Sequence, residues 1–334
     1  MELSLKGKHI LFISAQFFGY QSVIRDAMTS AGAIVDYFDE RPANNAFVKA
    51  AIRINRNILS SYINRYYENI IKRTQSVPYD YIFFIKCESV SPTHIEALKN
   101  IHPKAKFIVY HWDSYANNRN AKVVAPYFDR ILSFDKNDSI KYNLQFLPLF
   151  YTPEYAQIAK MEVPMKYDML FIGTVHSDRF HIIKRIEEII DNRGGKSFTW
   201  FYFPSKLLYY KMWFMDKSIR KVSQKIFHYQ SIGRKALVDS FASARIIVDI
   251  QHPKQTGLTM RCIETLGAKK KLVTTNEHIK NYDFYNPNNI LIIDRANPKI
   301  SEDFLVKPYE DIPIEIYERY SLNGWLSQIF YGLN

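Results

Sequence analysis

The chain has 334 residues, of which 47% are hydrophobic, and 45 Lys and Arg against 33 Asp and Glu give a formal net charge of +12. This length and apolar content exclude a single small module and are typical of two domains, each with its own core. The positive charge favours anionic partners, namely nucleotides, phospholipid head groups or nucleic acid, without choosing among them. Only two cysteines occur, Cys87 and Cys262, both in apolar segments, so they indicate buried thiols in a reducing cytosol rather than a disulfide framework.

No targeting or membrane-spanning segment is recognisable. The opening MELSLKGKHILFIS is too short and too soon interrupted for a signal peptide, and no segment reaches the roughly 18 apolar residues of a membrane span. Aromatic residues make up 15% of the chain, and beside Lys and Arg they are common at membrane interfaces and in sugar-binding clefts, although an AT-rich genome gives the same composition. We expect a cytoplasmic chain, with attachment to the inner face of the cytoplasmic membrane left open.

The first half alternates short apolar runs with helical segments. The predicted strands are 8–14, 34–38, 81–86, 106–111 and 130–134, and the predicted helices are 20–30, 49–73 and 92–100. The strands are continuously apolar, as expected when helices cover both faces of a sheet. This pattern predicts a doubly wound parallel sheet that binds ligands at the carboxyl ends of its strands.

The second half repeats this architecture after a polar segment, 152–166, which we interpret as a linker. The predicted strands are 168–172, 198–203, 245–250, 271–275 and 290–293, and the predicted helices are 178–192, 236–242 and 260–267. The expected fold is therefore α/β, with two Rossmann-like domains facing a cleft. The predicted domains are residues 1–152 and 167–312, and a helical tail, 313–334, is expected to pack across their junction.

One stretch of the second half, QHPKQTGLTMRCIETLGAKKKLVTTN (251–276), follows a strand with a glycine turn and an amphipathic helix. The first turn of a helix has unpaired amide donors and the positive end of the dipole, so it can hold phosphate. The phosphate candidates are Thr259 and the amides around Leu258, Arg261 is a second cation, and Glu264 could accept hydrogen bonds from ribose. The competing interpretation is a capped surface helix with an Arg261–Glu264 salt bridge.

A second glycine turn ends the 168–172 run. Gly173 lacks a β-carbon and allows close approach of a diphosphate, although an ordinary tight turn has the same signature. Thr174, His176 and Arg179 follow at a helix start, where Arg179 could stabilise charge that develops on a leaving nucleotide. His252, after a later strand, could contact sugar or phosphate, although a loop histidine is more often solvated. The sequence contains no Asp-x-Asp, so we expect neither a metal nor another cofactor.

Two segments, FIGTVHSDR (171–179) and TGLTMRCIE (256–264), are similar to parts of the GT-B glycosyltransferases, in particular the nucleotide-sugar-dependent enzymes of bacterial capsule and lipopolysaccharide synthesis. The first resembles the strand-glycine-helix unit that opens the donor domain of that family. The second resembles its Glu-x7-Glu phosphate and ribose motif, with Gly257 and Glu264 at matching positions. Thr256 stands where the family has its first Glu, so the resemblance implies ribose binding by Glu264 and leaves the donor sugar undefined.

The resemblance implies a metal-independent transfer of a hexose or related sugar from a nucleotide-sugar donor to a cell-envelope glycan or lipid-linked acceptor. YHWDS (110–114) and SFDKND (133–138), in the first half, also resemble segments of these enzymes. The donor is expected in the second domain and the acceptor in the first. The residues expected to line the acceptor side are Gln16, Phe17, Tyr20, His111 and Trp112.

Two carboxylates of the first domain are candidates for the general base. Asp113 follows Trp112 at a strand end, and a carboxylate that is partly desolvated beside an aromatic ring can act as a base. Its competing interpretation is a cap of the following loop through Ser114. Glu88, after the strand 81–86, is the second candidate.

Two basic aromatic segments, 49–73 and 206–235, resemble helices that lie at a membrane interface, which makes an anionic membrane surface an expected partner. The alternative is that their aromatic residues are core and their lysines are solvated. For the whole chain, the alternatives to an enzyme are a non-catalytic relative that binds glycan or nucleotide, and a basic nucleic-acid-binding protein. No nucleic-acid module is recognisable and the glycine turns favour a small phosphate ligand, so we expect no nucleic-acid partner.

Overall fold

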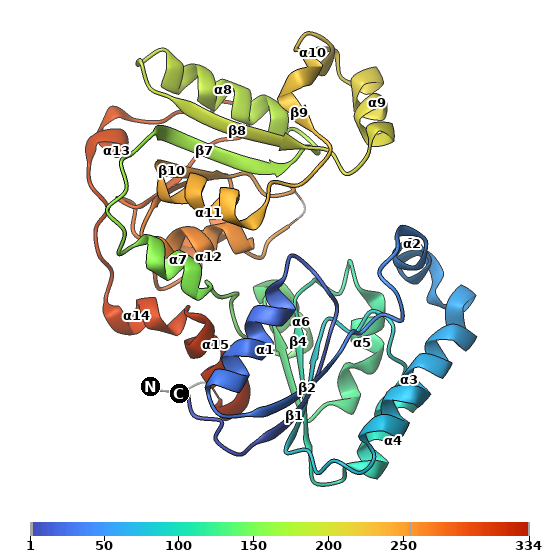
Figure 1. The fold of residues 1–334 in the computed structure, drawn as a ribbon. Coiled ribbons are helices and arrows are strands. Elements are labelled where there is room, and N and C mark those ends of the chain that lie inside the picture. Colours follow the sequence, from blue (N-terminus) through green and yellow to red (C-terminus); the bar gives the residue numbers. More distant parts are fainter. Residues whose placement is uncertain (1–2, 254, 333–334) are drawn as a thin grey trace. The chain divides into compact units, whose positions relative to one another are not determined.

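A computed structural model describes residues 3–253 and 255–332 of the chain, which form two compact units. The first unit comprises residues 3–149 and 322–332, and the second comprises residues 150–321. Each unit is built on a parallel sheet of six strands with helices on its faces (Figure 1). The expected α/β fold with two Rossmann-like domains is therefore confirmed.

The first sheet has the strand order β2-β1-β3-β4-β5-β6. Its strands are β1 (His9–Ser14), β2 (Ile34–Phe38), β3 (Tyr81–Ile85), β4 (Lys106–His111), β5 (Arg130–Ser133) and β6 (Gln145–Phe146). The helices of this unit are α1 (Tyr20–Ser30), α2 (Ala46–Asn55), the 3-10 helix η1 (Arg56–Leu59), α3 (Ser60–Thr74), α4 (Pro92–Ile101), α5 (Arg119–Val124), the 3-10 helix η2 (Ala125–Tyr127), α6 (Lys136–Tyr142) and α15 (Leu322–Tyr331). The chain places β2 on one side of β1 and then crosses to β3 on the other side. The order in which strands are added therefore reverses between β1 and β3, which is the switch point of this sheet.

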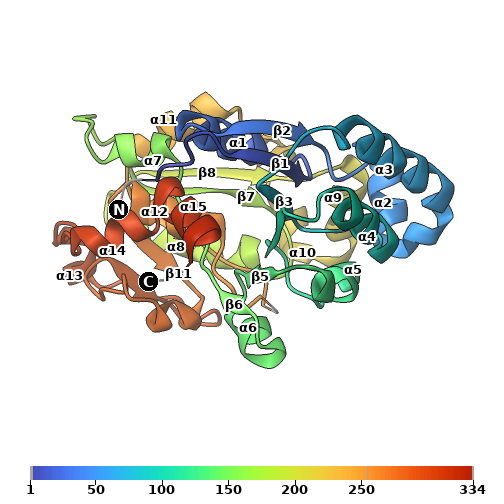
Figure 2. The same ribbon diagram turned by 90° about the horizontal axis from the view of Figure 1, so that it is seen from below.

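Both faces of the first sheet are buried because alternate side chains of each strand point to opposite faces. Leu11 and Ile13 belong to a core cluster that includes residues of α3 and α4. On the other face, Phe12 stacks on Phe83, which in turn contacts aromatic rings of α15. Helices α1 and α15 lie side by side on this second face (Figures 1 and 2). Burial on both faces explains why the strands read as continuous apolar runs.

The second sheet has the strand order β12-β11-β10-β7-β8-β9. Its strands are β7 (Tyr167–Thr174), β8 (Ser197–Tyr202), β9 (Phe227–His228), β10 (Ala244–Asp249), β11 (Lys271–Thr274) and β12 (Ile290–Ile292). The helices are α7 (Pro153–Ile158), α8 (Arg179–Asp191), α9 (Lys206–Met215), α10 (Lys217–Arg220), α11 (Arg234–Ala242), α12 (Met260–Gly267), α13 (Glu302–Val306) and α14 (Ile314–Arg319), with the 3-10 helices η3 (Gln224–Ile226) and η4 (Glu277–Asn281). Here the order changes direction between β7 and β10.

Helix α12 packs unusually close to the segment that opens the second unit. A β-carbon at Gly267 would lie 2.4 Å from Cγ and 2.6 Å from Cβ of Tyr151, so only glycine fits at this position. The hydroxyl of Tyr317, on α14, donates to the carbonyl of Gly267 at 2.6 Å. The hydroxyl of Tyr151 donates to the carbonyl of Tyr317 at 3.1 Å. These contacts tie α12, α14 and the start of the unit together.

Several elements differ from the expectation. The predicted helix 49–73 is three pieces, because the side chain of Asn55 accepts from the amide of Asn57 and starts a new helical turn. Helix α6 begins at Lys136, where the sequence pattern indicated no helix, and helix α7 occupies part of the predicted linker. The helical tail is two helices, of which α15 belongs to the first unit.

The two cysteines are buried thiols, as expected. Within the part of the chain that the structure describes, no helix is both long and apolar enough to cross a membrane.

Candidate functional site

The carboxyl ends of β7 and β10 are neighbours at the point where the second sheet changes direction. Ligands of open α/β sheets bind at such a point, because the loops that leave the two strands turn to opposite faces and open a crevice. Strand β7 ends in Gly173 and Thr174. Both residues were expected to follow the strand, but they belong to it. Strand β10 leads into Gln251 and His252. This edge therefore collects residues from both predicted glycine-turn segments.

Arg179 is fixed between the two strand ends. Its Nε donates to the carbonyl of Ile250 at 2.6 Å, and its Nη1 donates to the carbonyl of Thr174 at 2.9 Å. A β-carbon at Gly173 would lie 3.3 Å from Nη1 of Arg179 and 2.9 Å from the ring of Phe171. Gly173 thus makes room for the guanidinium, and the guanidinium in turn provides a fixed positive charge at the switch point.

A second arginine, which the sequence analysis missed, completes this edge. Arg295 follows β12, and its Nε and Nη2 donate to the two carboxylate oxygens of Asp178 at 3.0 and 2.7 Å. Its Nη1 donates to the hydroxyl of Thr275 at 2.8 Å, and its Nη2 to the carbonyl of Gln251 at 3.2 Å. Hydrogen bonding with Arg295 lowers the pKa of Asp178. The sequence feature that could have predicted Arg295 is its position just after a strand whose carboxyl end lies at the same edge of the sheet.

The histidines of the two loops come together beside these arginines. The rings of His176 and His252 are 5.4 Å apart between centroids, and Nδ1 of His176 is 3.0 Å from the hydroxyl of Ser177. Burial first, and then the charge of Arg179, lower the pKa of His176 to about 4. The ring is therefore neutral near pH 7 and offers hydrogen bonds rather than charge.

The start of α12 supplies less to an open site than the sequence suggested. Thr259 caps the helix, since its hydroxyl accepts from the amide of Cys262 at 3.4 Å and donates to Asp249 at 3.0 Å. Leu258 is 2% exposed and belongs to the core, and the carbonyl of Gly257 accepts from the side chain of Gln255 at 3.0 Å. Backbone amides of the first helical turn are the groups at this helix start that could still donate to a phosphate.

Glu264 lies inside the second unit and is only 3% exposed. Its Oε2 is 3.9 Å from Nη1 of Arg261, so the competing salt bridge is present but buried rather than on the surface. The guanidinium of Arg261 also lies 5.3 Å from the ring centroid of Phe241. Burial first, and then the charge of and a hydrogen bond with Glu264, raise the pKa of Tyr155 on α7. Glu264 thus joins α12 to α7.

In the first unit, the loops after β1 and β4 bring three predicted acceptor residues together. The ring of Trp112 lies 4.6 Å from that of Phe17 and 5.6 Å from that of Tyr20, between centroids. Nζ of Lys86, after β3, is 5.3 Å from the centroid of Phe17. Gln16 is exposed on the same loop. These side chains surround the point between β1 and β3 where the first sheet changes direction.

His111 does not line this surface. It is 1% exposed, and its Nε2 lies 3.1 Å from the hydroxyl of Tyr115. Adjacent strand residues point to opposite faces, so a histidine beside Trp112 must face away from it. Burial lowers the pKa of His111 to about 3, so the ring is neutral.

The two candidate bases differ in their surroundings. Oδ1 of Asp113 accepts from the amide of Ser114 at 3.1 Å and from Nδ2 of Asn117 at 2.9 Å, which is the loop-capping role that competed with catalysis. Glu88 is 8% exposed, and its carboxylate accepts from Nε of Arg41 at 2.8 Å. Nζ of Lys86 lies 3.8 Å from its other oxygen. Because two cations hold the buried Glu88, Asp113 is the better candidate for a general base.

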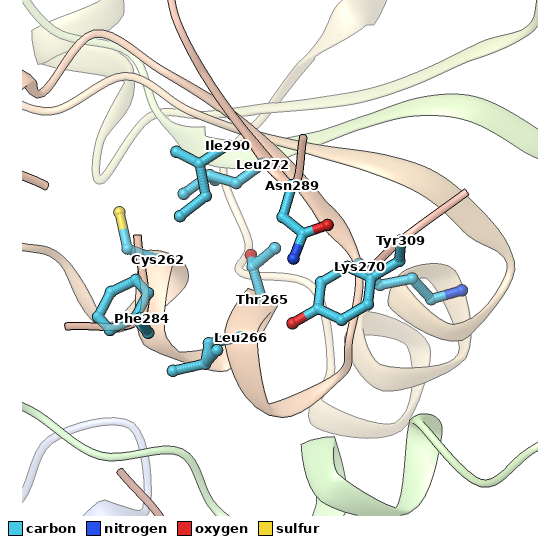
Figure 3. Close-up of a pocket in the computed structure, with 9 residues that line it drawn as sticks. All are labelled: Cys262, Thr265, Leu266, Lys270, Leu272, Phe284, Asn289, Ile290 and Tyr309. Carbon is cyan, nitrogen blue, oxygen red and sulfur yellow. The ribbon is translucent and has the colours of Figure 1, made fainter. Parts of the chain in front are cut away.

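A small cavity of about 10 Å³ lies elsewhere in the second unit, against residues of α12 (Figure 3). The residues that line it are Cys262, Thr265, Leu266, Lys270, Leu272, Phe284, Asn289, Ile290 and Tyr309. Leu272 and Ile290 lie near the starts of their strands, away from the carboxyl edge. The cavity is also smaller than the roughly 300 Å³ at which small-molecule sites begin. Among residues 3–253 and 255–332, no three His, Cys, Asp or Glu side chains are grouped to hold a metal ion.

Comparison with known proteins places the fold in a class. No protein-family model and no curated protein sequence matches the chain. Solved structures nevertheless share its two Rossmann-like domains from end to end, which is the GT-B architecture.

One of these structures is an alpha-glucosyltransferase in complex with UDP and a 13-mer DNA, which is 14% identical at a TM-score of 0.60 and covers 96% of this chain and 95% of its own. Another is OtsA, 11% identical at a TM-score of 0.64, with 98% and 100% covered. A third is a UDP-forming alpha,alpha-trehalose-phosphate synthase from Burkholderia xenovorans in complex with glucose-6-phosphate, 12% identical at a TM-score of 0.61, with 96% and 98% covered. At these identities the likeness shows the fold alone.

Proposed function

We propose that the chain is a glycosyltransferase that moves a sugar from a nucleotide-sugar donor to a glycan acceptor. The observation that carries this proposal is the group formed by Arg179, Arg295 and His176 at the switch point of the second sheet. Two fixed guanidinium groups and a neutral imidazole suit a diphosphate, because charge-assisted hydrogen bonds to phosphate oxygens are strong. The fold shared with an alpha-glucosyltransferase solved with UDP supports the same assignment.

In the proposed reaction, a hydroxyl oxygen of the acceptor attacks the anomeric carbon of the donor sugar. The bond from that carbon to the diphosphate oxygen breaks, and the nucleotide leaves with the electron pair. Arg179 stabilises the negative charge of the leaving diphosphate, in place of a metal ion. Asp113, or alternatively Glu88, takes the proton of the acceptor hydroxyl. Glu264 and the first amides of α12 hold the ribose and phosphate side of the donor.

The proposed acceptor is a cell-envelope glycan or lipid-linked glycan, as in capsule and lipopolysaccharide synthesis. The rings of Phe17, Tyr20 and Trp112 support a carbohydrate acceptor, because they form a joined apolar surface beside polar loops. A cytoplasmic location, peripheral on the inner face of the membrane, belongs to the same proposal. The basic aromatic segments 49–73 and 206–235 support it.

A nucleotide screen tests the donor site. Thermal shift with UDP, GDP, dTDP and CMP should single out one nucleotide, since a ligand at 100 times its Kd stabilises the native state by about 2.7 kcal/mol. In calorimetry, Arg295→Gln should lower the affinity for that nucleotide about 10- to 100-fold, because a charge-assisted hydrogen bond is lost. Arg245→Gln is the control, because Arg245 is exposed near the opposite end of β10. Stabilisation by none of the four nucleotides would remove the proposal.

The catalytic assignment has its own test. Asp113→Asn should lower the rate of sugar transfer by about 10²- to 10⁴-fold, because it removes a general base, while nucleotide affinity stays unchanged. The measurement is transfer or hydrolysis of the sugar nucleotide found by the screen. An unchanged rate assigns Asp113 to capping its loop. Nucleotide binding without turnover in the wild-type protein points to the non-catalytic relative.

A further inference from the structure

Helix α9 carries apolar side chains on most sides, interrupted by Lys206 and Lys211, yet it lies on the surface of the second unit. Only one of its ten residues, Tyr209, is buried. The exposed apolar side chains are Leu207 (78% exposed), Leu208 (44%), Tyr210 (49%), Phe214 (72%) and Met215 (77%). Single exposed apolar residues are common, but a contiguous set marks a surface that binds something. An apolar helix face of this kind is otherwise covered by a core or a membrane.

This helix is held in a fixed orientation. The ring of Tyr209 lies 5.5 Å from the rings of Phe203 and Phe227, between centroids, and these join the core of the second unit. Beyond α9, Asp216 accepts from Nε2 of His181 on α8 at 2.7 Å. Figure 1 shows α9 and α10 at the β8–β9 edge of this unit. The exposed apolar face is therefore presented by the fold and does not arise from a loose segment.

The surroundings of α9 are strongly basic. Residues 206–225 contain six cations and one acid, Asp216, a net charge of +5 from 6 − 1. The cations, all exposed, are Lys206, Lys211, Lys217, Arg220, Lys221 and Lys225. Asp216 is already engaged by His181 and Ser218. A second copy would bring the same positive charges face to face, so this charge favours an anionic partner over self-association.

The other basic aromatic segment, 49–73, also exposes apolar side chains, but one of its cations is turned inward. In α2 and η1, Phe47, Ile54 and Ile58 are exposed, but Nη1 of Arg56 donates to the carbonyl of Val90 at 2.8 Å. That cation is therefore turned into the first unit and away from a bilayer.

We propose that α9 and the following segment to residue 225 form a docking surface for an anionic lipid membrane. Leu207, Phe214 and Met215 enter the boundary of the acyl chains, and the surrounding lysines contact the head groups. This inference rests on the proposed function, because it names the surface through which the enzyme reaches a lipid-linked acceptor. Helix α9 begins soon after the carboxyl end of β8, so the docked face belongs to the same edge of the sheet as the candidate donor site.

Co-sedimentation of the full chain with vesicles tests the docking surface. We expect binding to vesicles of phosphatidylcholine with phosphatidylglycerol, weak binding to phosphatidylcholine alone, and release by high salt. Lys217→Gln with Lys221→Gln should lower partitioning about 25-fold, since each lysine near an anionic surface contributes about fivefold. Phe214→Ser with Met215→Ser should lower it at least as far. Both double variants change exposed side chains, so folding should be retained.

The matched control is Ile54→Ser with Ile58→Ser, which removes exposed apolar side chains from the first unit and should keep vesicle binding. Absence of wild-type binding at low salt would overturn the inference. So would loss of binding in the control with retention in the α9 variants. A wild-type dimer that Phe214→Ser with Met215→Ser converts to a monomer, without vesicle binding, would assign the face to self-association.

The nucleotide screen on the same variants keeps the two proposals separate. The α9 variants should bind nucleotide like the wild type, because the substituted side chains lie outside the donor site. Vesicle binding without nucleotide binding would retain the docking surface and remove the transferase proposal. Nucleotide binding without vesicle binding would retain the transferase proposal and remove the docking surface.

Discussion

The carboxylate of Glu264 lies between Arg261 and Tyr155, and this burial changes what its mutation reports. Glu264→Ala removes the acceptor of the tyrosine hydroxyl and the counterion of the arginine. The free energy of unfolding should fall by about 1–3 kcal/mol, the cost of a buried polar group left without its partner. Glu264→Gln keeps a polar contact, so its free energy of unfolding should fall by less. Urea unfolding of both variants measures the difference, and an Ala variant as stable as the wild type would contradict it.

Nucleotide binding by Glu264 is therefore best measured on the Gln variant, which separates affinity from folding. The expected result is a weaker calorimetric affinity, because an amide is a poorer acceptor for ribose hydroxyls than a carboxylate. An unchanged affinity would leave Glu264 as a residue that only joins α12 to α7.

Gly267 allows α12 to pack closely against Tyr151, so its substitution should affect stability. Gly267→Ala should lower stability by about 1–3 kcal/mol, because the new methyl group overlaps Cβ and Cγ of Tyr151, which cannot move without the backbone. Thermal unfolding measures the loss. Gly233→Ala is the comparison, because no atom lies within 4 Å of the added carbon and only a small capping effect is expected. Equal losses in the two variants would argue against the overlap.

Single residues of the candidate site could be predicted only in part. Gly173 and Arg179 were found because the glycine, the helix start and the cation are adjacent in sequence. Arg295 was missed because it reaches Asp178 across 117 positions of the chain. His111 was misplaced because its role was inferred from its neighbour, although neighbours in a strand face opposite sides.

At the scale of elements, the segment after β2 is locked to the loop after β3 by a buried acid. Glu40 is fully buried, and its Oε1 accepts from the amides of Ser89 and Val90. Its Oε2 is buried without a hydrogen-bond partner. Burial, reinforced by the charge of Glu88, raises the pKa of Glu40 to about 7. The loop it supports carries Lys86, whose backbone is left-handed at φ 84°.

This acid makes stability depend on pH with a definite sign. Between the unfolded pKa near 4.5 and the folded pKa near 7, the native state binds more protons, so stability falls as pH rises through this window. Glu40→Gln removes that dependence. Relative to the wild type, the variant should therefore gain stability between pH 4.5 and 7.5. Urea unfolding at a series of pH values measures this, and parallel curves for the two proteins would contradict the assignment.

Element positions followed well from the sequence where the pattern was long. The strands of the sheets read as continuous apolar runs because both of their faces are covered, and most ends were placed within two residues. Short elements such as α5, α7 and β6 were missed, because one or two turns give no measurable period. The break in the predicted helix 49–73 depends on a local cap at Asn55, which outweighs an otherwise helical pattern.

At the scale of the whole molecule, the first unit is completed by a helix that the chain reaches only after passing through the second unit. Trp325 of α15 is 1% exposed, and its ring lies 4.8 Å from that of Tyr110 and 6.1 Å from that of Phe83. Composition predicted two domains, and the tail was expected at their junction. Periodicity could not show which sheet face α15 covers, because that contact depends on residues distant in sequence.

Removal of residues 322–334 should therefore unfold the first unit and spare the second. The loss of stability should exceed the roughly 3–5 kcal/mol of a single buried Trp changed to Ala, since every buried side chain of α15 leaves the sheet face that this helix shares with α1. Limited proteolysis should degrade residues 1–149 and leave a resistant fragment near 150–321. Tyr331→Ala, at a half-exposed position, is the control and should resist like the wild type. A truncated chain whose first unit stays protected would contradict the role of α15.

The place of α15 also sets an order of events during translation. The ribosome releases strands β1 to β6 first, but helix α15, whose rings contact Phe83, emerges only after residues 150–321 have been made. At 5–20 residues per second, the part of this face that α15 covers stays open for roughly 10–35 seconds. The second unit is continuous in sequence and can close during that time. The unit that is synthesised first is thus completed last, and its open face is where a chaperone would be needed.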